Sequence, residues 1–187
     1  MRIVAGVHKG RNIIAPKGDK TRPTTDRMRE SIFNKLLHAS WAPSLDGARV
    51  IDLFAGSGAL GFEAISRGAG FALFVEIDAA ARGAIRQNVE AMALFGCTKL
   101  HRRSAIDLGT KPEKVGARFD IAFMDPPYGK GLGEISIAKL TEGEWLSDEA
   151  IICVEESARV SFDPPGPWGL LDEIEAGETK VRFLGRV

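Results

Sequence analysis

The feature that most constrains the fold is a glycine-rich turn that joins an apolar strand to a helix. The apolar run 48–54 leads into Gly56, Gly58 and Gly61, and helical periodicity then continues to about Arg67. Further apolar runs alternate with helical segments, so that we expect strands at 71–77, 98–101, 119–124 and 151–155 and a helix at 79–93. Strands that alternate with helices predict βαβ units and a parallel sheet with helices on both faces.

The N-terminal part departs from this alternation. The β-branched runs 2–5 and 11–15 flank a glycine turn and predict a hairpin. A helix follows, and Thr25 or Asp26 can cap its N-terminus. We therefore treat residues 1–44 as an extension that precedes the main domain.

The C-terminal part closes the expected sheet. The runs 170–175 and 179–184 flank a glycine turn and predict an antiparallel hairpin. Residues 45–187 then form an α/β domain of three layers around a seven-stranded, mainly parallel sheet.

The charge is distributed unevenly although the net charge is zero. Residues 1–36 hold nine Lys and Arg against three Asp and Glu, and the remainder is acidic by the same difference. A basic end on an otherwise acidic chain favours a polyanionic partner, and nucleic acid is the candidate.

The glycine turn predicts a site for a nucleotide cofactor. Its three glycines match G-x-G-x-x-G, and Glu76 at the end of the next strand is placed to bind ribose hydroxyls. Asp52 precedes the turn and would repel a pyrophosphate, whereas it would attract the sulfonium and ammonium of S-adenosylmethionine (SAM). We therefore favour SAM over NAD, with candidate cofactor-binding residues Asp52, Phe54, Ala55, Gly56, Ser57, Gly58, Glu76, Ile77 and Asp125.

A second motif, Asp125-Pro126-Pro127-Tyr128, follows the expected strand 119–124. The prolines fix φ and lack N–H groups, so the carbonyls around them are stiff acceptors, and Asp125 adds carboxylate oxygens. Tyr128 offers a ring on which a base can stack. These groups suit an exocyclic nucleobase amine, because acceptors that hold its N–H groups aim the nitrogen lone pair for methyl transfer. All four residues are catalytic candidates, and no general base is required.

Together these residues resemble the RsmD family of 16S rRNA guanine-N2 methyltransferases. The resemblance covers nearly the whole chain, and its most specific part is the block 21–34, which begins Thr-Arg-Pro-Thr-Thr-Asp-Arg. It implies a class I, Rossmann-like, SAM-dependent enzyme that modifies one guanine of small-subunit rRNA, either naked or within the subunit. Where the family carries an acid for the adenine amino group, this chain has Ser104 followed by Ala105, and both join the candidate cofactor residues.

The basic extension supplies the RNA-binding candidates Lys9, Arg11, Arg22, Thr24, Arg27 and Arg29. Three of them, Arg22, Thr24 and Arg27, can equally reach the carboxylate of SAM, and the sequence does not separate the two roles. Other functions stay open: methylation of adenine N6 or another exocyclic amine in DNA or RNA, an NAD-dependent oxidoreductase, and a non-catalytic RNA-binding module.

The two cysteines, Cys97 and Cys153, have no metal-ligand spacing, so we expect neither a disulfide nor a metal site. No signal peptide and no membrane-spanning run is apparent. We therefore expect a cytoplasmic monomer without a membrane partner.

Overall fold

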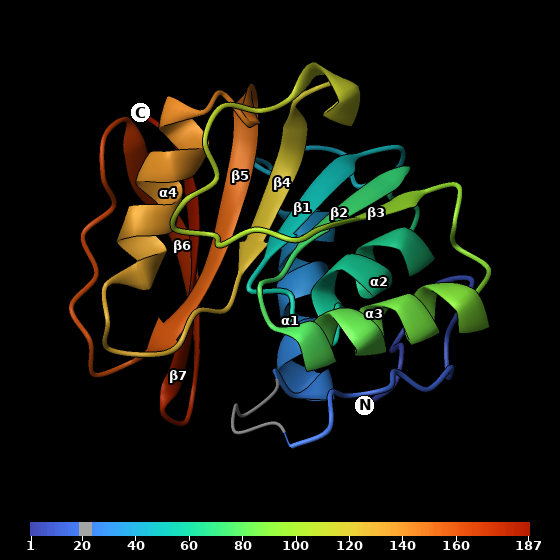
Figure 1. Cartoon of the computed structure of the whole chain (residues 1–187). Helices are drawn as coiled ribbons and strands as arrows, with labels where there is room; N and C mark the ends of the chain where they lie inside the picture. The colour runs from blue at the N-terminus through green and yellow to red at the C-terminus, as the bar shows by residue number, and fades with distance from the viewer. Residues whose placement is uncertain (19–23) are drawn as a thin grey trace.

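The computed structural model describes residues 1–18 and 24–187, and its centre is one seven-stranded sheet of order β3-β2-β1-β4-β5-β7-β6 (Figure 1). The neighbours from β3 through β5 pair in parallel, and β7 pairs antiparallel with both β5 and β6. The predicted mainly parallel sheet and C-terminal hairpin are thus confirmed. The strands are β1 (Arg49–Leu53), β2 (Phe71–Val75), β3 (Thr98–His101), β4 (Phe119–Met124), β5 (Leu146–Ser157), β6 (Trp168–Ala176) and β7 (Thr179–Arg186).

Helices cover both faces of the sheet and make the predicted three layers (Figure 1). One face packs against α1, α2 and α3, whose apolar side chains join a core cluster with Val50 of β1 and Phe123 of β4. The other face packs against α4, through Ile137 and Leu140. The helices are α1 (Asp26–His38), α2 (Ala59–Ser66), α3 (Ala79–Ala91), the 3₁₀ helix η1 (Glu113–Val115) and α4 (Leu132–Glu142).

Helix α4 and strand β5 differ from the sequence expectation, and the short helix η1 was also not predicted. Helix α4 was not predicted, because its buried positions include Gly133 and Ser136 beside only two apolar residues, so its apolar periodicity is short. Strand β5 begins at Leu146, five residues before the expected run. Its first residues include polar side chains that stay exposed, so no apolar run in the sequence marked the start of the strand.

The N-terminal segment is docked on α2. The predicted hairpin forms a single bridge, between Arg2 and Asn12, rather than two regular strands. The carboxylate of Glu63, which is fully buried, accepts hydrogen bonds from the backbone N–H groups of Val4 and Ala5 at 2.9 and 3.0 Å. The segment is therefore held by buried backbone contacts as well as by its apolar residues.

Asn88 of α3 connects the same segment to the glycine turn. Its side chain accepts from Ile14 N–H at 2.8 Å and donates to the carbonyls of Ile14 and Ser57 at 3.0 and 3.1 Å. The amide oxygen and the amide nitrogen of Asn88 are both hydrogen-bonded, and the side chain is fully buried. The N-terminal segment and the glycine turn thus share one rigid support.

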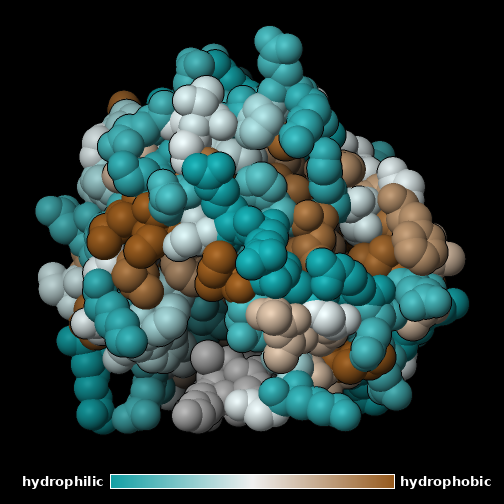
Figure 2. Space-filling view, viewed as in Figure 1, coloured by the Kyte–Doolittle hydropathy of each residue, from teal (hydrophilic) through white to brown (hydrophobic). Residues whose placement is uncertain are grey.

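The outer surface on the face shown in Figure 2 is mostly hydrophilic, and the apolar patches on it are separate from one another. In the described part of the chain, no helix is long and apolar enough to cross a membrane.

Candidate functional site

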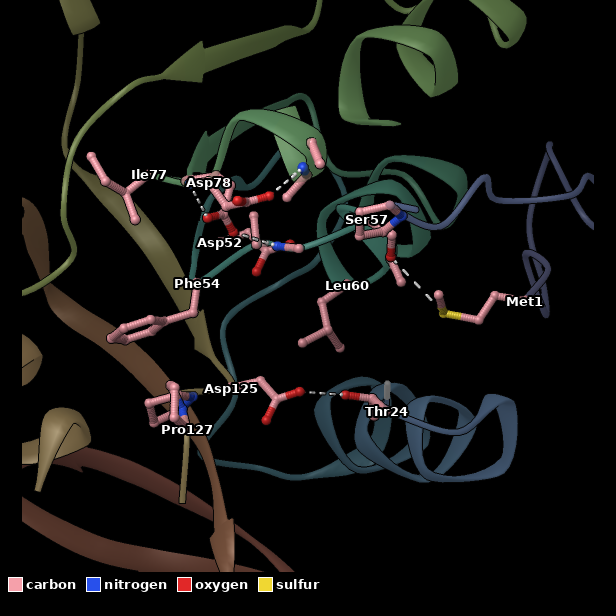
Figure 3. Close-up of a pocket in the computed structure, with 18 of the residues that line it drawn as sticks. Met1, Thr24, Asp52, Phe54, Ser57, Leu60, Ile77, Asp78, Asp125 and Pro127 are labelled. Carbon is pink, nitrogen blue, oxygen red and sulfur yellow. Dashed lines mark hydrogen bonds between the residues drawn. The ribbon is translucent and has the colours of Figure 1, made fainter. Parts of the chain in front are cut away.

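A cavity of about 730 Å³ opens at the carboxyl ends of the parallel strands. Because β1, β2 and β4 run in the same direction, the polar residues that follow them meet at this edge of the sheet. Figure 3 shows Asp52 on one side of the cavity and Asp125 with Thr24 on the other, with Phe54 and Leu60 between them. The two motifs predicted from the sequence therefore face the same space.

Most of the predicted site residues line this cavity, whereas Gly58, Ser104 and Ala105 do not. Ala105 is buried in the core cluster on the α4 face, and the Ser104 carbonyl accepts from Asp107 N–H. The assignment of both residues to the adenine of a cofactor stays a prediction. The predicted residues that line the cavity are Thr24, Asp52, Phe54, Ala55, Gly56, Ser57, Glu76, Ile77, Asp125, Pro126, Pro127 and Tyr128.

The glycines of the turn have different tasks. Both Gly56 and Gly58 have positive φ, of 56° and 81°, which favours glycine. A Cβ on Gly58 would lie 2.6 Å from the Phe62 ring and 3.0 Å from that of Phe74, so this glycine is needed for packing. Its role as a contact for the cofactor stays a prediction. A Cβ on Gly56 would meet only the Phe54 carbonyl, at 3.9 Å, so the backbone open to the cavity is that of Gly56.

Asp52 is a buried carboxyl at the floor of the cavity. It is 2 % exposed, and its Oδ2 accepts from Gly61 N–H at 3.0 Å. Burial, with a smaller contribution from Glu76, raises the pKa of Asp52 to about 8. Among the described residues it forms no ion pair, so a cationic ligand is the group that would hold it ionised. The site therefore fits the sulfonium and ammonium of SAM, and it does not fit a pyrophosphate.

Glu76 binds the glycine turn from the end of β2. Its two carboxylate oxygens accept from Gly56 N–H and Asp78 N–H, both at 2.8 Å. Each oxygen keeps a further lone pair for a hydroxyl of a ligand in the cavity. Asp78 instead caps α3 by accepting from Ala81 N–H at 2.8 Å. This arrangement favours Glu76 over Asp78 as the acid for a ribose.

The second motif is connected to residues far away in the sequence. Thr24 Oγ1 lies 3.2 Å from Asp125 Oδ2 and 3.1 Å from Glu155 Oε2. The Tyr128 hydroxyl donates to Glu155 Oε1 at 2.6 Å and lies 3.2 Å from Thr179 Oγ1. Burial and the neighbouring Glu155 raise the pKa of Asp125 well above its ordinary value. Burial and the hydrogen bond to Glu155 raise the pKa of Tyr128 as well.

Sequence reasoning missed Glu155 and Thr179. The signal for Glu155 was present, because it ends a predicted parallel strand next to β4, where Asp125 was found by the same rule. Thr179 lies at the turn between the antiparallel strands β6 and β7, and no strand-end rule identifies it. The cavity lining that was not predicted consists of Met1, Pro16, Lys17, Gly18, Ala59, Leu60, Asp78, Ala80 and Ala81.

The RNA-binding candidates separate into four groups, of which the buried Arg29 is described below. Lys9, Arg11 and Arg27 are exposed, although Arg11 also donates to the Ala91 carbonyl at 3.1 Å. Arg22 lies outside the described residues. Thr24 belongs to the cavity through the contacts given above.

The assignment of Arg29 to RNA is wrong. Its side chain is fully buried and forms an ion pair with Asp26 at 2.7 Å and another with Glu63 at 3.5 Å. It also donates to the carbonyls of Arg2 and Thr24. Arg29 therefore holds the extension together and has no free guanidinium for a phosphate.

The strand order, the glycine turn after β1 and the acid after β2 define a class I methyltransferase fold. A solved structure of Escherichia coli yhhF, 37% identical, superposes with a TM-score of 0.82 over 100% of this chain and 97% of that one. The fold prediction is thus confirmed.

A family model described as "Conserved hypothetical protein 95" matches residues 1–185. The chain is 36% identical over 187 residues to ribosomal RNA small subunit methyltransferase D of Escherichia coli K12, covering 100% of this chain and 90% of that protein. It is 33% identical over 184 residues to the protein of the same name from Haemophilus influenzae, covering 98% and 92%. The chain belongs to this family, the RsmD family, as the sequence motifs predicted.

Proposed function

We propose that this chain transfers a methyl group from SAM to the exocyclic N2 amine of a guanine in 16S rRNA. Membership of the family makes it an rRNA methyltransferase with SAM as its cofactor. The observation that carries the finer proposal is that Asp52 and Asp125 lie on opposite sides of one cavity. A cation and a nucleobase amine can therefore be held next to each other.

The first half of the cavity has the groups that would hold SAM, which supplies a methyl group on a sulfonium when bound. The Asp52 carboxylate attracts the cationic groups, and the open backbone at Gly56 allows close approach. Glu76 has lone pairs for ribose hydroxyls. Ile77, which is 61% exposed, and Phe54 offer apolar surface to the adenosine.

The other half has the groups that would hold the amine. An Asp125 oxygen accepts from an amine N–H, and this directs the nitrogen lone pair into the cavity. The Tyr128 ring, 39% exposed, can stack on a flipped-out base. The Asp125 oxygen that accepts the N–H and the nearby acids Glu155 and Glu156 stabilise the positive charge that develops on nitrogen.

The exposed cations of the N-terminal segment would bring the rRNA to this cavity. Lys9, Arg11 and Arg27 are free to approach phosphates, and Lys17 lies at the cavity itself. We propose that the substrate is 16S rRNA, in an assembled or assembling small subunit, in the cytoplasm. We also propose that the protein acts as a monomer, because one chain supplies both halves of the cavity.

The test is mass mapping of rRNA methyl groups from a strain that lacks this gene. We expect one methyl group on a guanine amine of 16S rRNA to be missing, and purified protein with SAM to restore it to rRNA or subunits from that strain. A missing methyl on an adenine, or an unchanged 16S rRNA, would contradict the guanine assignment.

A further inference from the structure

A line of four hydrogen-bonding groups crosses the amine half of the cavity. It runs from Asp125 to Thr24, from Thr24 to Glu155, and from Glu155 to the hydroxyl of Tyr128. Asp125 and Tyr128 lie in the loop after β4, Thr24 precedes the N-cap of α1, and Glu155 lies on β5. These side chains meet only in the folded protein. The number of protons that the four groups hold therefore depends on their contacts in the fold.

The count of hydrogens favours a proton on one of the two carboxyl groups. The Thr24 hydroxyl has one hydrogen and can donate to one carboxyl oxygen only. It lies within 3.2 Å of Asp125 Oδ2 and within 3.1 Å of Glu155 Oε2, so one of these contacts requires a hydrogen from the acid. If both acids were ionised, one contact would join two lone pairs in a buried place.

The length of the Tyr128–Glu155 hydrogen bond and the charges around Asp125 indicate that the proton is on Asp125. The Tyr128 hydroxyl lies 2.6 Å from Glu155 Oε1, a length typical of donation to an ionised carboxylate. Within residues 1–18 and 24–187, the charged groups that act on the Asp125 carboxyl are Glu155 and Glu156 from β5 and Asp52 from β1, and all three are acids. A second negative charge on Asp125 is therefore disfavoured, in agreement with the raised pKa of this carboxyl.

We infer that Asp125 and Glu155 share one proton through Thr24, with Asp125 neutral and Glu155 ionised in the substrate-free protein. Asp125 Oδ2 then donates to Thr24, Thr24 donates to Glu155, and Glu155 accepts from Tyr128. Glu155 is a positioning residue, because it holds both the hydroxyl of Thr24 and the ring of Tyr128.

This proton arrangement determines what Asp125 offers to a substrate. Its Oδ1 forms no hydrogen bond to any residue of 1–18 and 24–187, and in a neutral acid it is a carbonyl oxygen. A carbonyl oxygen accepts an N–H as an amide oxygen does. That an amine is the group it meets rests on the proposed function, whereas the shared proton does not.

Infrared difference spectroscopy tests the shared proton without any substrate. At neutral pH, the spectrum of the wild type minus that of Asp125→Asn should contain a carboxylic-acid C=O band. In Glu155→Gln this band should titrate at lower pH, because a negative neighbour is gone. A wild type that lacks the band, or a titration that Glu155→Gln leaves unchanged, would overturn the inference.

Thr24 offers a matched pair of variants for the same measurement. Thr24→Ser keeps the hydroxyl and should leave the frequency of the Asp125 band close to that of the wild type. Thr24→Val keeps the shape and removes the hydroxyl, so the frequency should shift. Equal spectra for the two variants would show that Thr24 does not connect the acids.

Tyr128 gives an independent signal because it is the only tyrosine in the sequence. The tyrosine Raman doublet reports whether a phenol hydroxyl is a strong donor. We expect strong-donor character in the wild type and its loss in Glu155→Gln, with thermal melting to show that the variant is folded. A doublet that Glu155→Gln leaves unchanged would contradict the positioning role.

Turnover links the inference to the reaction. Asparagine supplies a carbonyl acceptor and an N–H donor to Thr24, so kcat of Asp125→Asn should fall by ~10-fold at most, against ~100-fold or more for Asp125→Ala. Equal losses for the two variants would mean that an ionised Asp125 is required. If the wild type methylated no rRNA, the proposed function would fail while the infrared and Raman results still decided the inference.

Discussion

The two halves of the cavity are built in opposite ways. The half with Asp52 and Glu76 comes from β1, the glycine turn and the end of β2, and its carboxylates bind backbone N–H groups. The half with Asp125 is made by side chains from distant parts of the chain that bind one another, such as Thr24 and Glu155. The first half is supported by backbone contacts around the glycine turn, which Asn88 also connects to the N-terminal segment, whereas Thr24 contributes its own side chain to the second half.

The largest effect should come from removing Arg29, which supports the second half by donating to the Thr24 carbonyl. Arg29→Ala leaves buried Glu63 without one of its cations and should lower the free energy of unfolding by about 3–5 kcal/mol. Arg27→Ala, on the exposed side of the same helix, is the control and should change it by less than about 0.5 kcal/mol. Urea unfolding measures both, and similar values would show that the buried ion pairs do not hold the segment.

Asp52 tests the first half. Asp52→Asn keeps an acceptor for Gly61 N–H and removes the charge, so SAM affinity should fall by roughly 10- to 100-fold, as for a lost interaction with a charged group. A bound cation requires Asp52 to lose its proton, so the affinity of the wild type should rise with pH up to about 8. Calorimetric titration should show this rise in the wild type and a weaker pH dependence in Asp52→Asn.

The same carboxyl should also affect stability. The folded protein keeps the Asp52 proton up to about pH 8, whereas the unfolded chain loses it near pH 4. The contribution of this group is therefore fully present below about pH 4 and is lost as pH rises to about 8. Asp52→Asn should be more stable than the wild type at neutral pH, and an equal or lower melting temperature there would contradict the raised pKa.

Replacing Glu76 should have an intermediate effect on SAM affinity. Glu76→Ala removes the acceptor for Gly56 N–H and should weaken SAM binding by about 1–3 kcal/mol. Asp78→Ala removes the cap of α3 and should instead lower stability by about 1 kcal/mol. Calorimetry and thermal melting of both variants separate the roles, and a larger loss of affinity in Asp78→Ala would reverse the assignment.

The smallest effect per residue should come from the exposed cations. Lys9→Ala, Arg11→Ala and Arg27→Ala should each weaken rRNA binding modestly, independently of RNA sequence, and lower the salt dependence by about one unit of slope. SAM binding should not change, because none of the three lines the cavity. Filter binding over a series of salt concentrations measures the slope, and RNA affinity that does not respond to salt would exclude the segment as the RNA-binding surface.

The difference between the halves also explains what the sequence could predict. The strands 98–101 and 119–124 have the expected bounds, because apolar periodicity is a local property. Asp52, Glu76 and Asp125 were found because parallel strands bring their ends to one edge. The contacts of Thr24 and Tyr128 with Glu155 were not predicted, because they depend on the docking of the N-terminal segment and on side-chain direction.

Arg29 shows the corresponding limit for charge. A cluster of cations in a sequence predicts a basic surface. The Arg29 guanidinium is instead buried and paired with Glu63 of α2, and no local sequence pattern predicts this pair. Gly58 shows that a motif glycine can also be required for packing, because its missing side chain makes room for Phe62. The Arg29 error concerns a contact between elements distant in the sequence.

The most direct test of the account is single-turnover methyl transfer to 16S rRNA at saturating SAM, combined with SAM calorimetry, for Asp125→Ala. Because the halves are built separately, SAM affinity should stay within a few-fold of the wild type, while the transfer rate should fall by ~100-fold or more. A near-normal rate, or a loss of SAM binding as large as the loss of rate, would contradict the division of the cavity into a cofactor half and an amine half.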